Sequence, residues 1–123
     1  MNKKIFICDD NPIILEAVVL VLSIIDAIVV SERISSQALD YILKDKPDIF
    51  ICDLQMPELS GEDLIKQIRT HKECDDLFIL CMSASYNGRD IAINAGADDF
   101  LPKPFEINEL LAIVNRVLAV GAS

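Results

Sequence analysis

The segment Ile49-Phe50-Ile51-Cys52-Asp53 joins four consecutive apolar residues to a carboxylate, and Leu54-Gln55-Met56-Pro57 follows it directly. An unbroken apolar run is typical of a strand that is buried on both faces, whereas a half-exposed strand shows alternation. The runs Ile5–Cys8 and Leu77–Met82 are apolar in the same way. These segments predict central strands of a parallel sheet, and they raise the question of why one of them ends in a charge.

Strand patterns alternate with amphipathic helical patterns along the chain. The predicted strands are Lys4–Cys8, Ala27–Glu32, Ile49–Cys52, Leu77–Met82 and Asp99–Leu101. The predicted helices are Pro12–Ile25, Ser36–Lys44, Gly61–Thr70, Arg89–Ala95 and Ile107–Ala119. This alternation predicts an α/β fold with a five-stranded parallel sheet and helices on both faces. For this sheet we expect the order 2-1-3-4-5 of flavodoxin-like doubly wound folds, which is one of the common orders of such sheets. A length of 123 residues suits one domain, spanning residues 1–123.

Composition excludes several classes of function. The net charge of −9, from 20 acidic and 11 basic residues, argues against direct binding to nucleic acid or to an acidic membrane surface. The four cysteines include no C-x-x-C pair, and three of them lie inside apolar runs. Reduced thiols in a cytoplasmic protein without a zinc site are therefore expected.

The stretch from Pro12 to Val30 is apolar enough to require a membrane test. Its 19 residues approach the length of a transmembrane span, and its clearly polar members are Glu16, Ser23 and Asp26. Two acidic residues argue against insertion, and Asp9-Asp10-Asn11-Pro12 looks like a helix start. We expect no membrane insertion and a helix over Pro12–Ile25. Its sheet-facing residues are predicted to be Ile14, Ala17, Val18, Val21 and Ile25.

The opposite face of this predicted helix should be charged, yet Ile13, Val19 and Leu20 surround Glu16 and Ser23. Contiguous exposed apolar surface indicates a partner, which could be a kinase, a phosphotransfer helix bundle, a second copy of the chain or a missing domain. Tolerated surface apolarity is the equally weighted alternative.

Polar groups follow four of the five predicted strands. They are Asp9-Asp10, Asp53, Ser83-Ala84 and Pro102-Lys103-Pro104. Ligands of open parallel sheets bind beyond the carboxyl ends of the strands, so these groups predict one site at that edge.

The three carboxylates of this edge predict a cation site. With the first strand beside the third, Asp9, Asp10 and Asp53 would repel one another unless a cation or a proton intervened. Oxygen ligands without His or Cys suit Mg²⁺ better than zinc. The alternative is that Asp9-Asp10 only favours the helix dipole, and this is the weaker interpretation once Asp53 is included.

Lys103 and Ser83 complete the predicted site. A lysine fixed between two prolines can pair with a carboxylate or neutralise a phosphate, and Lys103–Pro104 is a candidate cis peptide. The Ser83 hydroxyl and the Ala84 backbone N–H could bind a phosphoryl oxygen. An exposed loop lysine and a turn serine are the ordinary alternatives. Together, these groups indicate phosphoryl transfer to a carboxylate.

These motifs resemble those of a known family. Asp9-Asp10, Asp53-Leu54-Gln55-Met56-Pro57 with Gly61, Ser83-Ala84 and the segment Gly96–Phe105 resemble the receiver domain of bacterial two-component response regulators. The resemblance covers essentially the whole chain, with the motifs in the order that the family shows.

The resemblance implies that Asp53 accepts a phosphoryl group from a phosphohistidine of a sensor histidine kinase or a histidine phosphotransfer protein. It implies that Mg²⁺ (or Mn²⁺) is held by Asp10, Asp53 and the carbonyl of Gln55, with Asp9 acting through a water. Lys103 would pair with the phosphoryl group. The chain would then be a signalling module that catalyses its own phosphorylation and slow dephosphorylation.

The resemblance also implies how a signal would leave the site. Ser83 and Phe100 match the switch pair, with Phe100 turning inward as Ser83 moves. The fourth helix, fifth strand and fifth helix would meet an output domain or protein, or form a homodimer. Gln55 and Ser85 match the positions that tune the lifetime of the aspartyl phosphate.

Two other classes compete with this interpretation. An aspartyl-nucleophile phosphatase places a second acid two positions after its nucleophile, but Gln55 stands there and cannot transfer protons. A flavodoxin-like electron carrier needs a phosphate-binding hydroxyl loop after the first strand, where Asp9-Asp10 would repel the flavin phosphate. The sequence leaves open whether the chain is a stand-alone shuttle or part of a longer regulator, with Val120–Ser123 as the start of a linker.

Overall fold

The apolar run that ends in Asp53 forms β3 (Ile49–Asp53), the middle strand of a five-stranded parallel sheet. The computed structural model describes residues 3–121. The other strands are β1 (Lys3–Cys8), β2 (Ala27–Glu32), β4 (Phe78–Ser83) and β5 (Asp99–Pro102). Their order is β2-β1-β3-β4-β5, which confirms the predicted topology.

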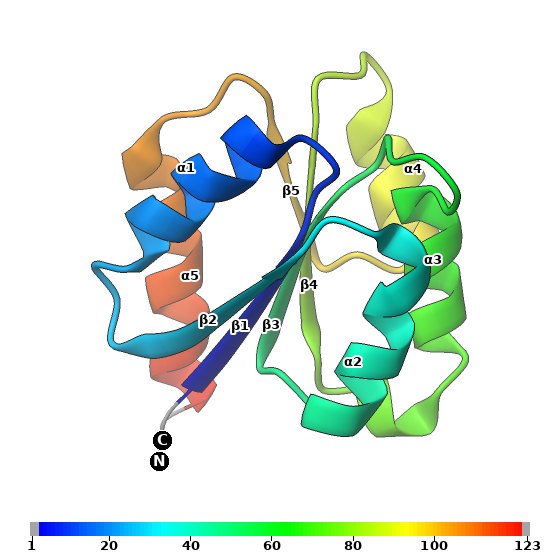
Figure 1. Ribbon diagram of the computed structural model, residues 1–123, viewed down its shortest axis with the longest axis horizontal. Coiled ribbons are helices and arrows are strands. Elements are labelled where there is room, and N and C mark those ends of the chain that lie inside the picture. Colours follow the sequence, from blue (N-terminus) through cyan, green and yellow to red (C-terminus); the bar gives the residue numbers. More distant parts are fainter. Residues whose placement is uncertain (1–2, 122–123) are drawn as a thin grey trace.

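Helices cover both faces of the sheet. They are α1 (Pro12–Leu22), α2 (Ala38–Asp45), α3 (Gly61–Arg69), α4 (Gly88–Ala95) and α5 (Ile107–Gly121), with short 3₁₀ turns η1 (Ser35–Gln37) and η2 (Lys72–Cys74). α1 and α5 lie on one side of the sheet, and α2, α3 and α4 lie on the other (Figure 1). The structure therefore has the doubly wound α/β arrangement that the sequence predicts.

Two cores explain why the central strands are continuously apolar. Alternate residues of β3 point to opposite faces, so Phe50 packs in the core under α2, α3 and α4, while Ile51 packs in the core under α1 and α5. Both side chains are fully buried. A strand with helices on both faces has no solvent-facing position for a polar residue, and the first carboxylate comes where the strand ends.

The register of the sheet brings the polar strand ends together. Cys8 of β1 lies opposite Cys52 of β3, so Asp9 and Asp53 each follow a paired cysteine at the same level of the sheet. On the other side, Asp53 lies opposite Met82 of β4. The site is therefore built where the ends of β1, β3 and β4 lie side by side.

α1 differs from the predicted helix in its end and in its buried face. It ends at Leu22, before Ile25, and the Ser23 hydroxyl donates a 2.6 Å hydrogen bond to the carbonyl of Leu20. The buried residues are Leu15, Val18 and Leu22, whereas Ala17, which was predicted to face the sheet, is exposed. A helix that is apolar on nearly every side carries little periodic information, so its rotation is decided by docking against the sheet and α5.

Several other predictions are tested by the fold. The predicted helix from Ser36 is wrong at its start, because the 3₁₀ turn η1 precedes α2. The remaining predicted bounds agree within two residues.

No helix in the described chain is long and apolar enough to cross a membrane. The suggested linker lies partly in α5, which extends to Gly121, and Ala122 and Ser123 lie outside the described residues.

All four cysteines are buried and free, including Cys74, which the sequence places in a polar segment. Burial raises the pKa of the Cys8 thiol to about 12, with nearby Glu32 and Asp9 adding to the shift. A protonated, buried thiol is a small apolar side chain and not a nucleophile.

Arg69 ties the end of α3 to the connection between α4 and β5. Its guanidinium donates hydrogen bonds to the carbonyl of Gly96 (2.9 Å), the carbonyl of Cys74 (2.8 Å) and the carboxylate of Asp98 (2.8 Å). A lysine carries the charge but not the planar fork that reaches all three acceptors. Arg69→Lys is therefore expected to lower the free energy of unfolding by about 1–2 kcal/mol in urea titrations. The exposed Arg33→Lys is the control, and equal stability of the two variants would contradict this role.

Candidate functional site

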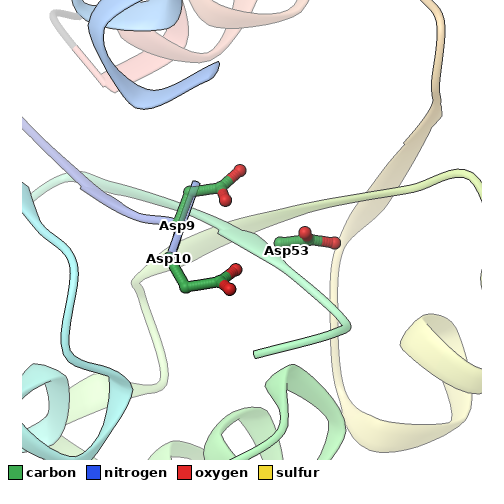
Figure 2. Close-up of side chains that lie close together, drawn as sticks. All are labelled: Asp9, Asp10 and Asp53. Carbon is green, nitrogen blue, oxygen red and sulfur yellow. The ribbon is translucent and has the colours of Figure 1, made fainter. Parts of the chain in front are cut away.

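Three carboxylates gather at the carboxyl edge of the sheet. Asp9 and Asp10 follow β1, and Asp53 ends β3, with one oxygen of each within 4.8 Å of the others. Asp9 is fully buried, while Asp10 and Asp53 are half-buried. Figure 2 shows the three side chains close together above the strand ends. The structure thus brings together the three acids that the sequence analysis selects.

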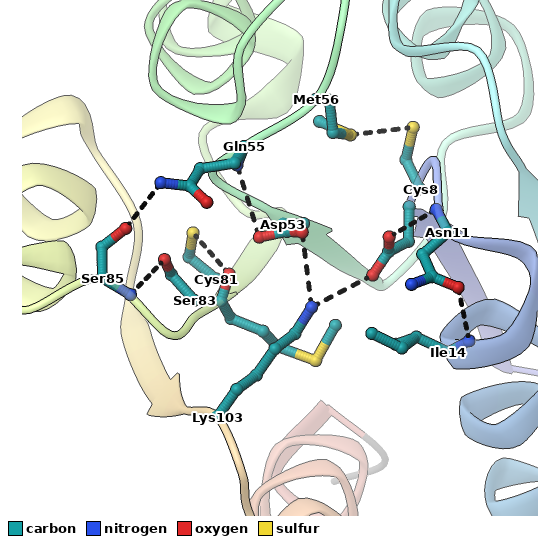
Figure 3. A network of polar contacts seen from close by, with 12 residues as sticks. Cys8, Asn11, Ile14, Asp53, Gln55, Met56, Cys81, Ser83, Ser85 and Lys103 are labelled. Atoms are coloured by element: carbon teal, nitrogen blue, oxygen red, sulfur yellow. Dashed lines mark hydrogen bonds and ion pairs between the residues drawn. The ribbon is translucent and has the colours of Figure 1, made fainter.

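Lys103 bridges two of these acids from the far side of the site. Its ammonium lies 3.3 Å from Oδ2 of Asp53 and 3.4 Å from Oδ2 of Asp9, and its side chain is only 16% exposed (Figure 3). The Lys103–Pro104 peptide bond, the candidate named from the sequence, is cis. The backbone N–H of Lys103 also donates to the carbonyl of Ser83 (2.9 Å), so β4 helps to direct the lysine.

The buried position of Asp9 controls its ionisation. Desolvation raises the pKa of the Asp9 carboxyl above its ordinary value, and the nearby charge of Asp53 adds to the increase. The backbone N–H of Asn11, which donates a 3.0 Å hydrogen bond to Asp9, and the ammonium of Lys103 oppose this shift. The carboxyl is therefore held in a place where an added cation would be strongly favourable.

The donor set fits a hard divalent cation. The candidate ligands are carboxylate oxygens, and the nearby thiol of Cys8 contacts the sulfur of Met56 at 3.7 Å instead of facing the acids. Oxygen ligands and two half-exposed carboxylates suit Mg²⁺, which keeps several waters and takes few protein ligands. The residues present therefore fit the predicted metal.

A series of hydrogen bonds begins at Oδ1 of Asp53, the carboxylate oxygen that Lys103 does not contact. The backbone N–H of Gln55 donates to Oδ1 of Asp53 (3.3 Å), and the side-chain amide of Gln55 donates to the hydroxyl of Ser85 (2.8 Å). The backbone N–H of Ser85 in turn donates to the hydroxyl of Ser83 (3.0 Å). The two residues predicted to tune lifetime, Gln55 and Ser85, are thus in direct contact (Figure 3).

Ser83 and Phe100, the predicted switch pair, lie beneath the start of α4. Ser83 is 1% exposed and Phe100 is 5% exposed, so the aromatic ring already points inward. A Cβ at Gly88 would lie 2.9 Å from the ring and 3.2 Å from the Cβ of Ser83, which explains the glycine. The guanidinium of Arg89 lies 5.5 Å from the ring centroid. The switching roles of Ser83 and Phe100 stay predictions, as does the role of the Ala84 backbone.

The loop after Asp53 closes tightly on the strand. The N–H of Gly61 donates to the carbonyl of Leu54 (2.8 Å), and a Cβ at Gly61 would lie 2.7 Å from the Cα of Leu54. Only glycine allows this approach of helix to strand. Gly61 was part of the family pattern, and the structure supplies the steric reason.

Sequence reasoning missed three residues around the site: Gly88 and Arg89 at the Phe100 ring, and Ser35 beside the loop after Asp53. Gly88 and Arg89 lie at the start of a predicted helix, where nothing in the local pattern distinguishes them. Ser35 lies in a predicted loop, and its buried hydroxyl is a consequence of the tertiary fold alone.

The outer face of α1 is apolar in the structure as well. On α1, Ile13 is 78% exposed and Leu20 is 72% exposed, and Ile24, which follows the end of α1 and was not predicted, is 74% exposed. Val19, by contrast, is half-buried and packs against the core under α1 and α5, and it also lines the groove beside α1. Its position follows from the rotation of α1 described above.

An open groove of about 1140 Å³ runs from this face toward the carboxylates. Leu20, Ile34 and Pro57 give it apolar walls, and its lining also includes four acids, Asp10, Glu16, Glu32 and Glu58, against one base, Arg33. Asp10 thus belongs both to the groove and to the acidic cluster.

Comparisons with known proteins agree with this geometry. The family model for the response regulator receiver domain matches residues 5–115 of this chain. Response regulator MprA of Mycobacterium bovis (strain BCG / Pasteur 1173P2) is 38% identical over 120 residues, which are 96% of this chain and 51% of that protein. The chain therefore spans about half the length of the curated relatives it matches.

Solved structures show the same fold. A protein of Chloroflexus aurantiacus J-10-fl, assigned as a response regulator, has a TM-score of 0.91 and 33% identity, covering 97% of this chain and 99% of that one. The receiver domain of sensor histidine kinase PA1611 from Pseudomonas aeruginosa PAO1 has a TM-score of 0.88 and 24% identity, covering 97% and 99%. That structure has a magnesium ion coordinated in its active site cleft. At this identity the likeness supports the fold only.

The doubly wound fold and the acidic site at the ends of β1 and β3 define a class of signalling modules. The chain belongs to the response regulator receiver domain family of bacterial two-component systems. Receiver domains bind Mg²⁺ at an acidic pocket, and Asp9, Asp10 and Asp53 form an acidic cluster of this kind in the described chain.

The raised pKa of Asp9 predicts how the stability of the protein depends on pH. The pKa of the Asp9 carboxyl is raised in the folded protein, so the carboxyl ionises more easily in the unfolded chain. The free energy of unfolding of the wild type should therefore fall as the pH rises from the ordinary aspartate pKa to the raised pKa. Asp9→Asn lacks this titration. In chelator without divalent metal, its free energy of unfolding is expected to increase relative to wild type across that pH range. A difference that stays constant with pH would contradict a raised pKa in the folded protein.

Proposed function

We propose that Asp53 accepts a phosphoryl group from a phosphohistidine of a sensor histidine kinase or a histidine phosphotransfer protein. The observation that carries this proposal is the ammonium of Lys103, which lies within 3.4 Å of both Asp9 and Asp53 in a cluster of three carboxylates. A carboxylate with a fixed cation on one side and metal ligands on the other is suited to receive a phosphate.

In the proposed step, an oxygen of Asp53 forms a bond to phosphorus while the bond from phosphorus to the donor imidazole nitrogen breaks. The imidazole keeps the electron pair. Asp10, Asp53 and the carbonyl of Gln55 would hold Mg²⁺ (or Mn²⁺), with Asp9 acting through a water, and the ion would neutralise charge on the phosphoryl oxygens. Lys103 would move its ion pair from the Asp53 carboxylate to the new phosphoryl oxygens.

The groups on the β4 side would bind the product. The hydroxyl of Ser83 accepts the N–H of Ser85 in this structure, and it could turn its proton toward a phosphoryl oxygen. The N–H of Ala84 would bind another oxygen. Since the ring of Phe100 packs against the start of α4, a shift of Ser83 would be transmitted to α4, β5 and α5. We propose this surface as the contact to the output or to a second copy.

Gln55 and Ser85 would set the lifetime of the aspartyl phosphate. Their side chains are joined by a 2.8 Å hydrogen bond beside Asp53, where a hydrolytic water would approach. The amide of Gln55 cannot act as a general base, so this position does not support sustained phosphatase activity.

We further propose that the donor docks on α1 and the groove beside it. Ile13, Leu20 and Ile24 would pack against an apolar helix of the donor, which would bring its histidine toward the site through the Asp10 end of the groove. The acidic lining favours a donor with basic residues around its apolar face and disfavours a second copy of this acidic chain.

Phosphorylation at Asp53 can be tested directly. Wild type treated with acetyl phosphate and Mg²⁺ is expected to gain the mass of one phosphoryl group, and Asp53→Asn is expected to gain none, because an amide is not a nucleophile here. Intact-protein mass spectrometry with and without chelator measures both. An equal gain of mass in Asp53→Asn would overturn the assignment of Asp53.

The docking proposal predicts a separable defect. Leu20→Lys should slow phosphotransfer from a phosphorylated donor by roughly tenfold, because burial of a leucine side chain contributes about 1.5–3 kcal/mol. Acetyl phosphate should still modify this variant at the wild-type rate. Ile93→Lys on α4 is the matched control, since Ile93 is also exposed but lies across the sheet. Equal donor kinetics in both variants would exclude α1 as the docking face.

A further inference from the structure

We propose that Ser35 is a positioning residue for the loop that follows Asp53, because its hydroxyl binds both ends of a strained turn in that loop. The inference rests on the proposed function, since the same loop supplies the Gln55 carbonyl to the metal. Ser35 itself lies in η1, on the connection between β2 and α2, and is distant from the loop in sequence.

Ser35 is one of the few polar residues buried in the described chain, with 2% of its surface exposed. Its hydroxyl donates a 2.9 Å hydrogen bond to the carbonyl of Pro57 and accepts a 3.2 Å hydrogen bond from the N–H of Leu59. The N-cap residue of η1 is Ile34, so Ser35 is the first residue of the turn and not its cap. The buried hydroxyl is therefore committed to the neighbouring loop and not to its own helical turn.

The turn that Ser35 holds is unfavourable by itself. Glu58 has a φ of 70°, in the left-handed region, and the N–H of Leu59 also donates to the carbonyl of Pro57 at 2.8 Å. A hydrogen bond between residues two apart, around a central residue of positive φ, is the rare and strained form of the γ-turn. A residue with a side chain persists there only where its surroundings hold it. Ser35 supplies that restraint at both ends of the turn.

This turn lies in the same short loop as the proposed metal ligand. The loop begins after Asp53, where the N–H of Gln55 donates to the Asp53 carboxylate, and it ends at Gly61, which is bonded back to Leu54. Those bonds fix the two ends of the loop, and Ser35 holds its middle. Release of the middle would let the peptide of Gln55 rotate, so its carbonyl would no longer be held in the place from which it would bind the cation.

The chain provides a matched control beside Ser35. The hydroxyl of Ser36 reaches the same turn, but it is exposed and donates at 3.2 Å to the side-chain carboxylate of Glu58. That contact does not bind the backbone of the turn. The substitution Ser36→Ala should therefore leave the loop unchanged, although Ser35 and Ser36 are neighbours in the sequence.

The test measures Mg²⁺ affinity by calorimetry in four proteins: wild type, Ser35→Ala, Ser36→Ala and the double variant Ser35→Ala/Glu58→Gly. Ser35→Ala is expected to weaken Mg²⁺ binding by about tenfold, as is usual when an outer support of a metal ligand is lost. Ser36→Ala should bind as wild type does. Glycine adopts positive φ without strain, so Glu58→Gly should restore most of the affinity that Ser35→Ala loses.

The outcomes separate a positioning role from general stability. Ser35→Cys keeps the volume of the side chain with a much weaker donor, and it replaces Ser35→Ala if that variant does not fold. Faster hydrogen exchange at Leu59 together with weaker Mg²⁺ binding supports the inference. Loss of thermal stability with wild-type Mg²⁺ affinity, or no recovery with Glu58→Gly, overturns it. If wild type binds no Mg²⁺, the proposed function itself fails.

Discussion

Electrostatic repulsion among Asp9, Asp10 and Asp53 is the constraint around which the rest of the structure is arranged. The ammonium of Lys103 offsets part of this repulsion, and it lies close to both Asp9 and Asp53. The hydrogen bond from the backbone N–H of Lys103 to the carbonyl of Ser83 helps to direct the lysine inward. A cation bound by these carboxylates would neutralise the negative charge that the lysine leaves uncompensated.

The parallel sheet holds these charges in place because it is buried on both faces. Neighbouring strands are in register at Cys8 and Cys52, so the carboxylates that follow lie at one level. The loops beyond the strands are less regular, and each is held by a specific contact: Gly61 against Leu54, and Ser35 against the turn at Glu58. A rigid sheet with loops held by specific contacts keeps the three carboxylates and Lys103 in a fixed arrangement.

Much of the fold and of the site was predictable because local patterns carry it. Continuous apolar runs identified the central strands, and polar residues immediately after them identified the edge where chemistry occurs. The face of α1 was not predictable, because a helix apolar on nearly all sides can dock in several rotations; Ala17 is exposed, and Val19 is half-buried. The role of Ser35 was hidden for a different reason, since its partners lie more than twenty residues away.

The sequence by itself determined the strands, the family and the residues that follow the strand ends, because strand burial and strand-end position are local properties. Only the tertiary structure decided how those residues touch one another. Packing between distant segments sets the distances from Lys103 to two carboxylates and the hydrogen bond between Gln55 and Ser85. It also buries the ring of Phe100 and places the hydroxyl of Ser35 at the carbonyl of Pro57. Such contacts follow from side-chain volume and helix docking in three dimensions, which no periodic pattern encodes.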